Sequence, residues 1–189
     1  MNEILKAIHD RRTIRDFKPD QQISDDHLQT ILEAGHQAPS AWNRQPWHFT
    51  VVTKQSLLNR IEDVARGAIT KVSPEQVEKM PWLVAPGFHY FYEAPTVVFV
   101  SGNPKIDSAQ GDCAIACLNM VYAAHSLGIQ SCVIVTALAA FTTDQGPGFV
   151  ADLEIPEGYE PMYAMSFGYS SKPIPSAAPR KEDFLNYIK

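Results

Sequence analysis

Apolar and polar residues follow two different spacings along this chain, and together they predict an alternation of helices and strands. Helical spacing marks five stretches, of which the fourth is apolar nearly all round and is therefore expected to lie in the centre of the molecule. These stretches are residues 2–10, a helix that Ser24 caps and that ends before Pro39, residues 54–66, Ala109–Leu127 with Gly128 as its C-cap, and residues 147–153.

Four short runs of β-branched and aromatic residues predict strands: His48–Val52, Thr96–Ser101, Ile129–Val135 and Pro161–Tyr169. The long helix joins the second strand to the third, so these two strands are expected to form a parallel pair. The remaining pairings are expected to be antiparallel. The pattern therefore predicts an α+β fold with a central mixed sheet flanked by helices.

The stretch 67–93 follows neither spacing over any length. Its prolines and polar residues suggest a short helix near 74–79, and after it comes a mobile excursion rich in aromatic residues. Two interpretations of the excursion stay open. It forms a roof over a bound ligand, or it belongs to the core or to a subunit interface. Its aromatic and imidazole side chains are Trp82, Phe88, His89, Tyr90, Phe91 and Tyr92.

Composition places the chain among ordinary globular proteins. Of its 189 residues, 45% are hydrophobic and 20% are charged, which is enough apolar material for one core. Residues 1–189 are therefore expected to form a single domain. The segment 170–189 is rich in proline and is expected to run over a surface as an extended tail, with a short helix or strand at 181–188.

Charge and hydropathy narrow the possible partners and the expected location. The formal net charge of −5 argues against nucleic acid as a partner. No run approaches the roughly 18 apolar residues of a membrane span, and residues 1–10 are amphipathic, without the apolar centre of a signal peptide. We therefore expect a cytoplasmic protein with no membrane partner.

The chain contains three cysteines, Cys113, Cys117 and Cys132, an odd number that fits a disulfide framework poorly. Cys113 and Cys117 are four residues apart on the long helix, but a zinc site would need two further ligands at suitable spacing. Buried core thiols are the better interpretation, and no metal site is expected.

A cluster of cations lies near the start of this acidic chain. Arg11, Arg12, Arg15 and Lys18 surround the hydroxyl of Thr13. Guanidinium groups with a hydroxyl hold phosphate by charge-assisted hydrogen bonds. Cations after a helix also complement the helix dipole without any ligand. The cluster alone does not choose between a phosphate site and a helix end.

A polar loop, Ser40–Pro46, separates the second helix from the first strand. Its hydroxyl and amide groups, on Ser40 and Asn43, are suited to the edge of a heteroaromatic ring. The alternative is a turn stiffened by prolines, and Trp47 is expected to pack in the core. Asp112, near the start of the long helix, is expected to cap that helix.

In combination these segments resemble the nitroreductase family of flavin enzymes. The resemblance rests on Arg-Arg-Thr-x-Arg-x-Phe from Arg11, and on Ala-Pro-Ser-x-x-Asn-x-Gln-Pro-Trp-x-Phe from Ala38. It is extended by Ser126–Ser131 after the long helix, and by Phe167-Gly168-Tyr169 with a later Pro179-Arg180-Lys181. These motifs occur in order over essentially the whole chain.

The resemblance implies an obligate homodimer with FMN in clefts at the subunit interface. It places Arg11, Arg12 and Thr13 at the FMN phosphate and ribityl chain, and Arg15 at the ribityl chain or the pyrimidine edge of the ring. The residues implied to contact the cofactor elsewhere are Arg180 at the phosphate, Gln37, Pro39, Ser40, Ala41 and Asn43 at the isoalloxazine from the second subunit, and Val135, Thr136, Ala137 and Leu138 along its other side.

The resemblance also implies the reaction. NADH or NADPH reduces the flavin, which then reduces nitroaromatic, quinone or similar acceptors by ping-pong turnover, and no side-chain acid or base is required. The tail 170–189 is expected to wrap the partner subunit. Many family members carry Pro-x-Glu-Gly where this chain has Val135–Phe141, so the backbone N–H at flavin N5 stays unassigned. The alternative is an FMN-binding carrier or sensor of the same fold without nicotinamide turnover.

Overall fold

The protein is described by a computed structural model that covers residues 2–72 and 74–189. Its helices are α1 Glu3–Asp10, α2 Asp25–His36, α3 Gln55–Val72, α4 Pro74–Lys79, α5 Ala109–Ser126 and α6 Gly146–Asp152. Short 3-10 helices are η1 Ala41–Asn43, η2 Pro81–Val84 and η3 Thr136–Thr142, and the strands are β1 Trp47–Val52, β2 Thr96–Gly102, β3 Gln130–Ile134 and β4 Glu160–Gly168.

The four strands form one sheet in the order β1-β2-β4-β3, and each neighbouring pair is antiparallel. The expected α+β class and flanking helices are confirmed, but the mixed sheet is wrong for these strands. β2 and β3 point the same way, as a connection through α5 requires, yet β4 lies between them. The order of elements along the chain predicts that β2 and β3 run in the same direction. It contains no information that β4, a later strand, lies between them.

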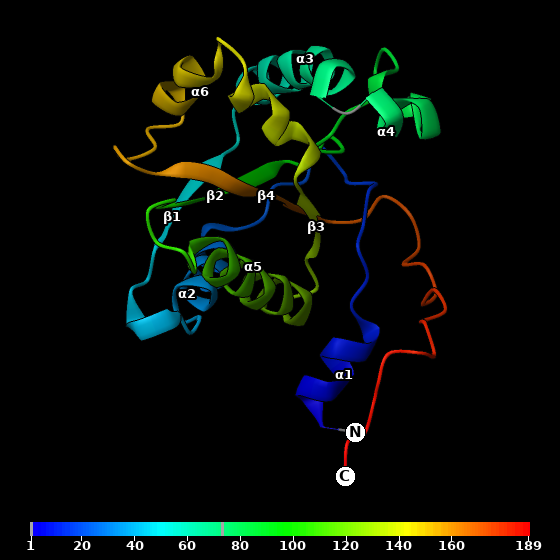
Figure 1. The fold of residues 1–189 in the computed structure, drawn as a ribbon. Helices are drawn as coiled ribbons and strands as arrows, with labels where there is room; N and C mark the ends of the chain where they lie inside the picture. The colour runs from blue at the N-terminus through cyan, green and yellow to red at the C-terminus, as the bar shows by residue number, and fades with distance from the viewer. Residues whose placement is uncertain (1, 73) are drawn as a thin grey trace.

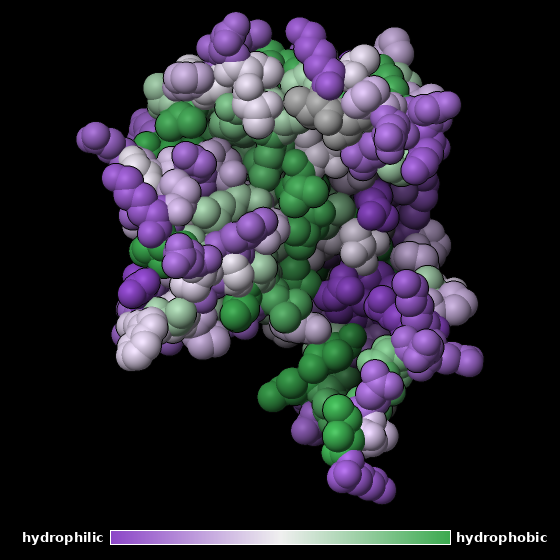
Figure 2. All heavy atoms as spheres, viewed as in Figure 1, coloured by the Kyte–Doolittle hydropathy of each residue, from purple (hydrophilic) through white to green (hydrophobic). Residues whose placement is uncertain are grey.

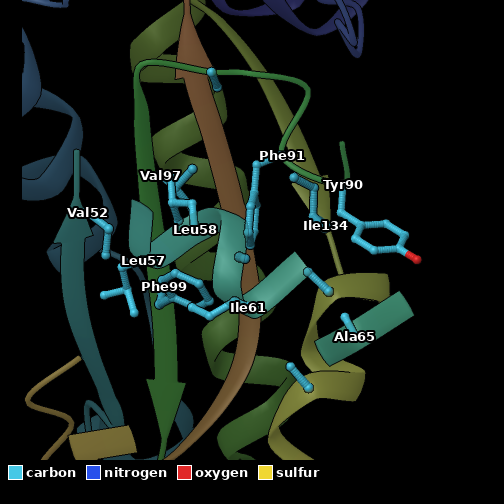
Figure 3. Packing of buried hydrophobic residues seen from close by; sticks show 14 of the residues in the cluster. Val52, Leu57, Leu58, Ile61, Ala65, Tyr90, Phe91, Val97, Phe99 and Ile134 are labelled. Atoms are coloured by element: carbon cyan, nitrogen blue, oxygen red, sulfur yellow. The ribbon is translucent and has the colours of Figure 1, made fainter. Parts of the chain in front are cut away.

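Helices cover both faces of the sheet (Figure 1), so the molecule has two apolar layers. α2 and α5 pack on one face around Ile31, Met120 and Phe167, each fully buried. α3 and η3 pack on the other face, where Leu58 and Ile61 of α3 share a core cluster with Phe99 of β2. Figure 3 shows this second layer, in which side chains from α3 interlock with those of β2 and with the aromatic residues that precede it.

Most predicted elements begin where local chemistry indicates. The Ser24 side chain accepts a hydrogen bond from the His27 N–H at 3.3 Å and so caps α2. Leu127 rather than Gly128 is the C-cap of α5, and Gly128 follows it with φ 73°, the left-handed position that glycine occupies most easily. Trp47 is 7% exposed, which confirms its expected place in the core.

Three local expectations are wrong. α3 continues to Val72 rather than ending at residue 66, because Ala68 and Ile69 extend its buried stripe. The excursion is packed rather than free, since Tyr90 and Phe91 are buried. Residues 181–188 form neither helix nor strand, and every residue there is exposed.

The N-terminal segment extends the edge of the sheet beyond β3. Thr13 forms an isolated parallel bridge with Ser131, and the Ile14 N–H donates to the Ser131 carbonyl at 3.1 Å. Phe17 bridges Ser170, and the Lys18 N–H donates to the Tyr169 carbonyl at 2.9 Å. These bonds lay the cationic cluster along the open edge of the sheet.

Candidate functional site

A cleft of about 560 Å³ opens between the edge of the sheet and the aromatic excursion. One wall comes from the end of β3 and the residues after it, and the other from α4, η2 and the excursion. Most of the lining is apolar or aromatic, with Arg15 as its one cation among the described residues. The lining residues are Arg15, Gln76, Met80, Trp82, Leu83, Phe88, Tyr90, Tyr92, Cys132, Val133, Ile134, Val135 and Thr136.

The aromatic wall is built by edge-to-face contacts. The ring of Phe88 lies 5.0 Å from that of Trp82, 5.5 Å from Tyr90 and 5.9 Å from Tyr92, measured between centroids. The Tyr90 hydroxyl donates to the Leu83 carbonyl at 2.6 Å, which satisfies the polar end of a buried ring. The wall is therefore a preformed apolar surface of the size that a planar ligand uses.

Helix α3 holds the wall in place. The Glu62 carboxylate, 1% exposed, accepts the Phe91 N–H at 2.8 Å and contacts His89 Nδ1 at 2.8 Å. One turn later, Arg66 donates to the Ala85 and Phe88 carbonyls at 2.7 and 3.1 Å. These bonds satisfy backbone groups that an irregular segment would otherwise leave open.

Arg15 enters the cleft beside Tyr92, with its guanidinium carbon 5.9 Å from the ring centroid. Burial raises the pKa of Tyr92, and the nearby Arg15 opposes that shift. Burial likewise raises the pKa of Cys132 to about 11, again opposed by Arg15. The tyrosine and the thiol are thus neutral at pH 7, and Arg15 supplies the positive charge of this cleft.

A smaller cavity of about 100 Å³ lies further along the same edge. Ser131 lines it, and the next residue, Cys132, lines the cleft, so the two spaces follow one another along β3. Arg11 and Arg12 line the small cavity with Asp10 and, from the tail, Ile174. The Asp10 carboxylate is hydrogen-bonded to His9 Nδ1 at 3.0 Å, and this bond lowers the pKa of Asp10.

The cationic cluster separates into different roles in the structure. Arg12 Nη1 donates to the His9 and Arg11 carbonyls at 2.6 and 2.8 Å, so this arginine closes the end of α1. Its Nε is buried and has no partner among the described residues. Arg11 Nη1 reaches only the Thr13 hydroxyl, at 3.4 Å. Arg11, Thr13 and Arg12 Nε therefore keep donor capacity that an anion could use.

The four residues after β3 that were expected at the flavin fall into two pairs, one in the cleft lining and one outside it. Val135 and Thr136 line the cleft, with the Val135 side chain 57% exposed. Ala137 is fully buried, and Leu138 packs partly buried against the core below α3. Both residues of this second pair lie outside the cleft lining.

The loop that carries the second motif lies at a different end of the sheet from the cleft. In Figure 1 it follows α2 and precedes β1, whereas the cleft adjoins β3 at the opposite edge. One chain therefore does not bring this loop to Arg15. The loop and helix-end residues concerned are Gln37, Pro39, Ser40, Ala41 and Asn43.

Arg180 also stands apart from both cavities, in the exposed tail. The tail does pass the small cavity at Ile174, six residues earlier. Lys172 Nζ contacts Asp16 at 2.7 Å, and the Ser171 N–H donates to the Asp16 carbonyl, which fixes the start of the tail beside the cationic segment.

Trp82 and Tyr92 line the cleft, although motif spacing gave neither a role. The available signal was the density of aromatic residues between 82 and 92, which suggested a roof or a core cluster without choosing between them. The structure shows that part of the segment is core, because Tyr90 and Phe91 are buried, and that Trp82, 49% exposed, lies in the wall of the cleft. Across residues 2–72 and 74–189, no group of three or more metal-ligating side chains comes together, and no helix is long and apolar enough to span a membrane.

Comparison with known proteins agrees with this geometry. A sequence profile of the nitroreductase family matches residues 8–169, and the chain belongs to that family. A nitroreductase with bound FMN from Bacteroides fragilis has 31% identity and a TM-score of 0.89, with both chains covered completely. One from Desulfitobacterium hafniense, also with bound FMN, has 32% identity and a TM-score of 0.88 over the whole of both chains.

A further relative comes from Methanothermobacter thermautotrophicus and carries the provisional name NADH dehydrogenase/NAD(P)H nitroreductase. It is 29% identical over 175 residues, which is 90% of this chain and 78% of the relative. The resemblance that the motifs indicated is confirmed at the level of the family.

Proposed function

We propose that this protein is an FMN-dependent oxidoreductase that takes hydride from NADH or NADPH and passes it to a nitroaromatic, quinone or similar acceptor. The observation that carries the proposal is the order of groups along β3, from a small cavity with arginine donors to an aromatic cleft with one cation. The FMN named for the two similar structures and the NAD(P)H in the name of the archaeal relative support it.

The donors present fit the phosphate of FMN. Arg11 and Arg12 line the small cavity, where the Arg11 guanidinium and the buried Nε of Arg12 can offer charged hydrogen bonds. The Thr13 hydroxyl lies beside them, 3.4 Å from Arg11 Nη1, and can offer a neutral hydrogen bond. Arg180 would join them from the tail, which passes that cavity at Ile174. Arg12 contributes through Nε alone, because its Nη1 is already bonded to two carbonyls.

The cleft fits the ring system. Val135 and Thr136 would lie along one side, with Ala137 and Leu138 contributing backbone groups only. Arg15 would stabilise negative charge at the pyrimidine edge of the ring. When bound, FMN supplies hydride exchange between the nicotinamide and the acceptor in turn. The chain's own residues bind and orient the ring and exclude water, so no catalytic side chain is assigned.

The proposed site is shared between two copies of the chain. Ser40, Ala41 and Asn43, with Pro39 and Gln37, would reach the ring from the second subunit, because within one chain they lie at another edge of the sheet. Exposed apolar side chains support a homodimer, since large patches of this kind mark interfaces. Figure 2 shows apolar surface over the central face and along α1. Exposed apolar residues include Ile4, Leu5, Ile8, Ile115, Leu118, Val133 and Val135.

The proposal also covers the role of the C-terminal tail and the location of the protein. Residues 1–189 act as one domain, with 170–189 wrapping the partner subunit through Phe184, Leu185 and Ile188, which one chain leaves exposed. Three unpaired cysteines support a reducing, cytoplasmic location.

Anaerobic titration tests the activity. Purified protein is expected to be yellow, and NADH or NADPH should bleach its visible flavin band. A yellow protein that neither coenzyme bleaches would support a carrier or sensor instead. A colourless protein that cannot take up FMN would contradict both.

Arg11→Ala tests the phosphate end. We expect FMN affinity to fall about tenfold, the effect of losing a charge-assisted hydrogen bond of about 1.5 kcal/mol. Titration of apo-protein with FMN measures it, and Lys6→Ala, an exposed cation on α1, is the control. Unchanged affinity in Arg11→Ala would leave Arg11 as a helix-end charge only.

A further inference from the structure

Asp112 is a buried carboxylate in the first turn of α5. It is 6% exposed, and no lysine, arginine or histidine nitrogen lies within 4.0 Å of it in the described part of the chain. Ser108 occupies the N-cap position of the helix, without a capping hydrogen bond from its side chain, so the expected role of Asp112 as the cap is wrong. A buried carboxylate without a cation needs hydrogen-bond donors to offset the loss of its hydration.

Its donors come from two places. The Ser108 hydroxyl donates to Oδ2 at 2.8 Å, within the same turn. The Ala41 N–H lies 3.2 and 3.3 Å from Oδ1 and Oδ2, and this contact spans 71 residues of sequence. Asp112 therefore ties the start of α5 to the turn that carries Ser40 and Asn43.

That turn is held in an unusual backbone conformation. Trp42, Asn43 and Gln45 have φ of 56°, 53° and 47°, three left-handed residues without a glycine. A bulky residue such as tryptophan rarely adopts this conformation. Such strain persists only where the surroundings fix the backbone, and it is concentrated at functional sites. Asp112 and the Ser40 hydroxyl, which accepts the Gln45 N–H at 2.9 Å, are the fixing contacts.

The turn presents donors and a large ring outward. The Ser40 oxygen is occupied as an acceptor, so its proton is free to be donated. Asn43 Oδ1 accepts from Gln45 Nε2 at 3.2 Å, which leaves the Asn43 amide hydrogens free. Trp42 is 89% exposed. These are groups suited to the acceptor edge and the face of a flat heteroaromatic ring.

We infer that Asp112 is a positioning residue for the flavin site of the partner subunit. It holds the 40–45 turn in the one conformation that presents Ser40, Trp42 and Asn43 to the ring bound by the other chain. The inference rests on the proposed function and adds to it a buried group that no motif includes.

The first test compares flavin-loaded variants. Asp112→Ala should raise the FMN dissociation constant about threefold and lower kcat/KM for the nicotinamide about tenfold, because the ring loses orientation more than binding. Ser108→Ala is the matched control, since it removes the other donor to the same carboxylate and leaves the Ala41 contact. It should stay within about twofold of wild type. Asp112→Asn keeps an oxygen for the Ala41 N–H and should lie between the two.

The second test asks which subunit's site is affected. A mixed dimer is made from one Asp112→Ala chain and one chain with Arg11→Ala and Arg15→Ala. If the turn acts on the partner's site, one site carries both lesions and the other carries none. Activity should then recover to about half that of the wild-type dimer, above both parent homodimers. A role confined to folding of its own subunit predicts no recovery.

The outcomes separate this inference from the proposed function. A wild-type protein that binds no FMN contradicts the proposed function. Normal flavin binding and turnover by Asp112→Ala overturns the role of Asp112 and leaves the proposed function intact. If Asp112→Ala does not fold, Asp112→Asn in the same mixed dimer decides, and a mixed dimer no more active than its parents overturns the inference.

Discussion

Residues that are adjacent in sequence have different surroundings in the cationic segment. Arg12 is bonded through Nη1 to the end of α1, Arg11 faces the small cavity, and Arg15 reaches the aromatic cleft beside Tyr92. Alternation along an extended segment explains this, because Ile14 between them is buried. The charge of Arg15 therefore acts on the cleft separately from the charges of Arg11 and Arg12 at the small cavity.

Arg15→Ala is expected to lower the flavin midpoint potential by about 30 mV, because a cation near the ring stabilises the negative charge of the reduced state. Spectroelectrochemistry of the loaded protein measures this shift. Lys18→Ala is the control, since Lys18 is an exposed cation three residues away that lines neither cavity. Equal potentials in wild type and Arg15→Ala would remove Arg15 from the ring.

The three buried thiols are expected to make the free energy of unfolding depend on pH in the alkaline range. Burial raises the pKa of Cys113 and Cys117 to about 12 and that of Cys132 to about 11, from an ordinary value of 9.0. Above pH 9 the unfolded chain loses thiol protons that the folded chain keeps, so the unfolded state gains stability. The free energy of unfolding should therefore be unaffected by these groups below pH 9 and fall as pH rises toward 11.

Urea unfolding at a series of pH values tests this dependence. Cys117→Ala should make the decline above pH 9 shallower, whatever its effect on stability at pH 7. A slope that is identical in the variant and the wild type would show that this thiol does not carry the effect.

Among the elements, α3 does the most to shape the cleft. Glu62 and Arg66, one turn apart, bind the N–H and carbonyl groups of residues 85–91 and so turn an irregular segment into a fixed wall. Val77 and Met80 pack against the same core from α4 and the residue after it. The shape of the wall therefore depends on a helix that contributes no side chain to the cleft lining.

Glu62→Ala is expected to lower the free energy of unfolding by about 3 kcal/mol, because it leaves the Phe91 N–H without its buried acceptor. Urea denaturation provides the measurement. Glu62→Gln, which still offers an oxygen to that N–H, should lose less. Asp63→Ala changes an exposed carboxylate next to it, 3.8 Å from Arg66, and should stay within about 0.5 kcal/mol of wild type.

Sequence patterns predicted the elements wherever the signal was local. Ser24 marks a helix start by its side-chain cap, and Pro39 and Gly128 follow helix ends because of their own backbone preferences. The apolar run of β2 matches a strand in which every residue is buried. The insertion of β4 between β2 and β3 depends on contacts distant in sequence, which spacing does not contain. The fixed position of the aromatic wall could not be predicted for the same reason, since it depends on hydrogen bonds with Glu62 and Arg66 on another element.

Part of the candidate site could likewise be predicted from the sequence, and part could not. Motifs predicted Arg11, Arg15, Val135 and Thr136, which the structure brings to one edge of the sheet. For Trp82 and Tyr92 the sequence leaves a roof and a core cluster open, because aromatic residues at irregular spacing occur as readily in a core. The role of Asp112 was also invisible, because its partner, the Ala41 N–H, is a backbone group 71 residues away.

At the scale of the whole molecule, the proposed site is incomplete in one chain. The cleft lies at the β3 edge, the 40–45 turn lies beside β1, and the tail leaves the surface near Ile174 with its apolar residues exposed. A dimer that joins these parts would cover the exposed apolar residues and complete the site in one step.

Deletion of residues 174–189 is expected to weaken both the dimer and FMN binding, because it removes the exposed apolar tail and Arg180 together. Sedimentation over a range of concentrations should show a raised dimer dissociation constant, by about tenfold or more. Full-length Arg180→Ala should lose FMN affinity while it keeps the dimer. A truncated protein that stays as dimeric as wild type would contradict the wrapping role of the tail.

We propose that two copies of this chain form a shared flavin site that accepts hydride from a nicotinamide. Anaerobic titration of the purified, FMN-loaded protein with NADH and with NADPH tests it most directly. We expect at least one coenzyme to bleach the visible flavin band completely, with one equivalent per FMN, and an added quinone to restore it. Bound flavin that stays oxidised in the presence of both coenzymes would contradict the account.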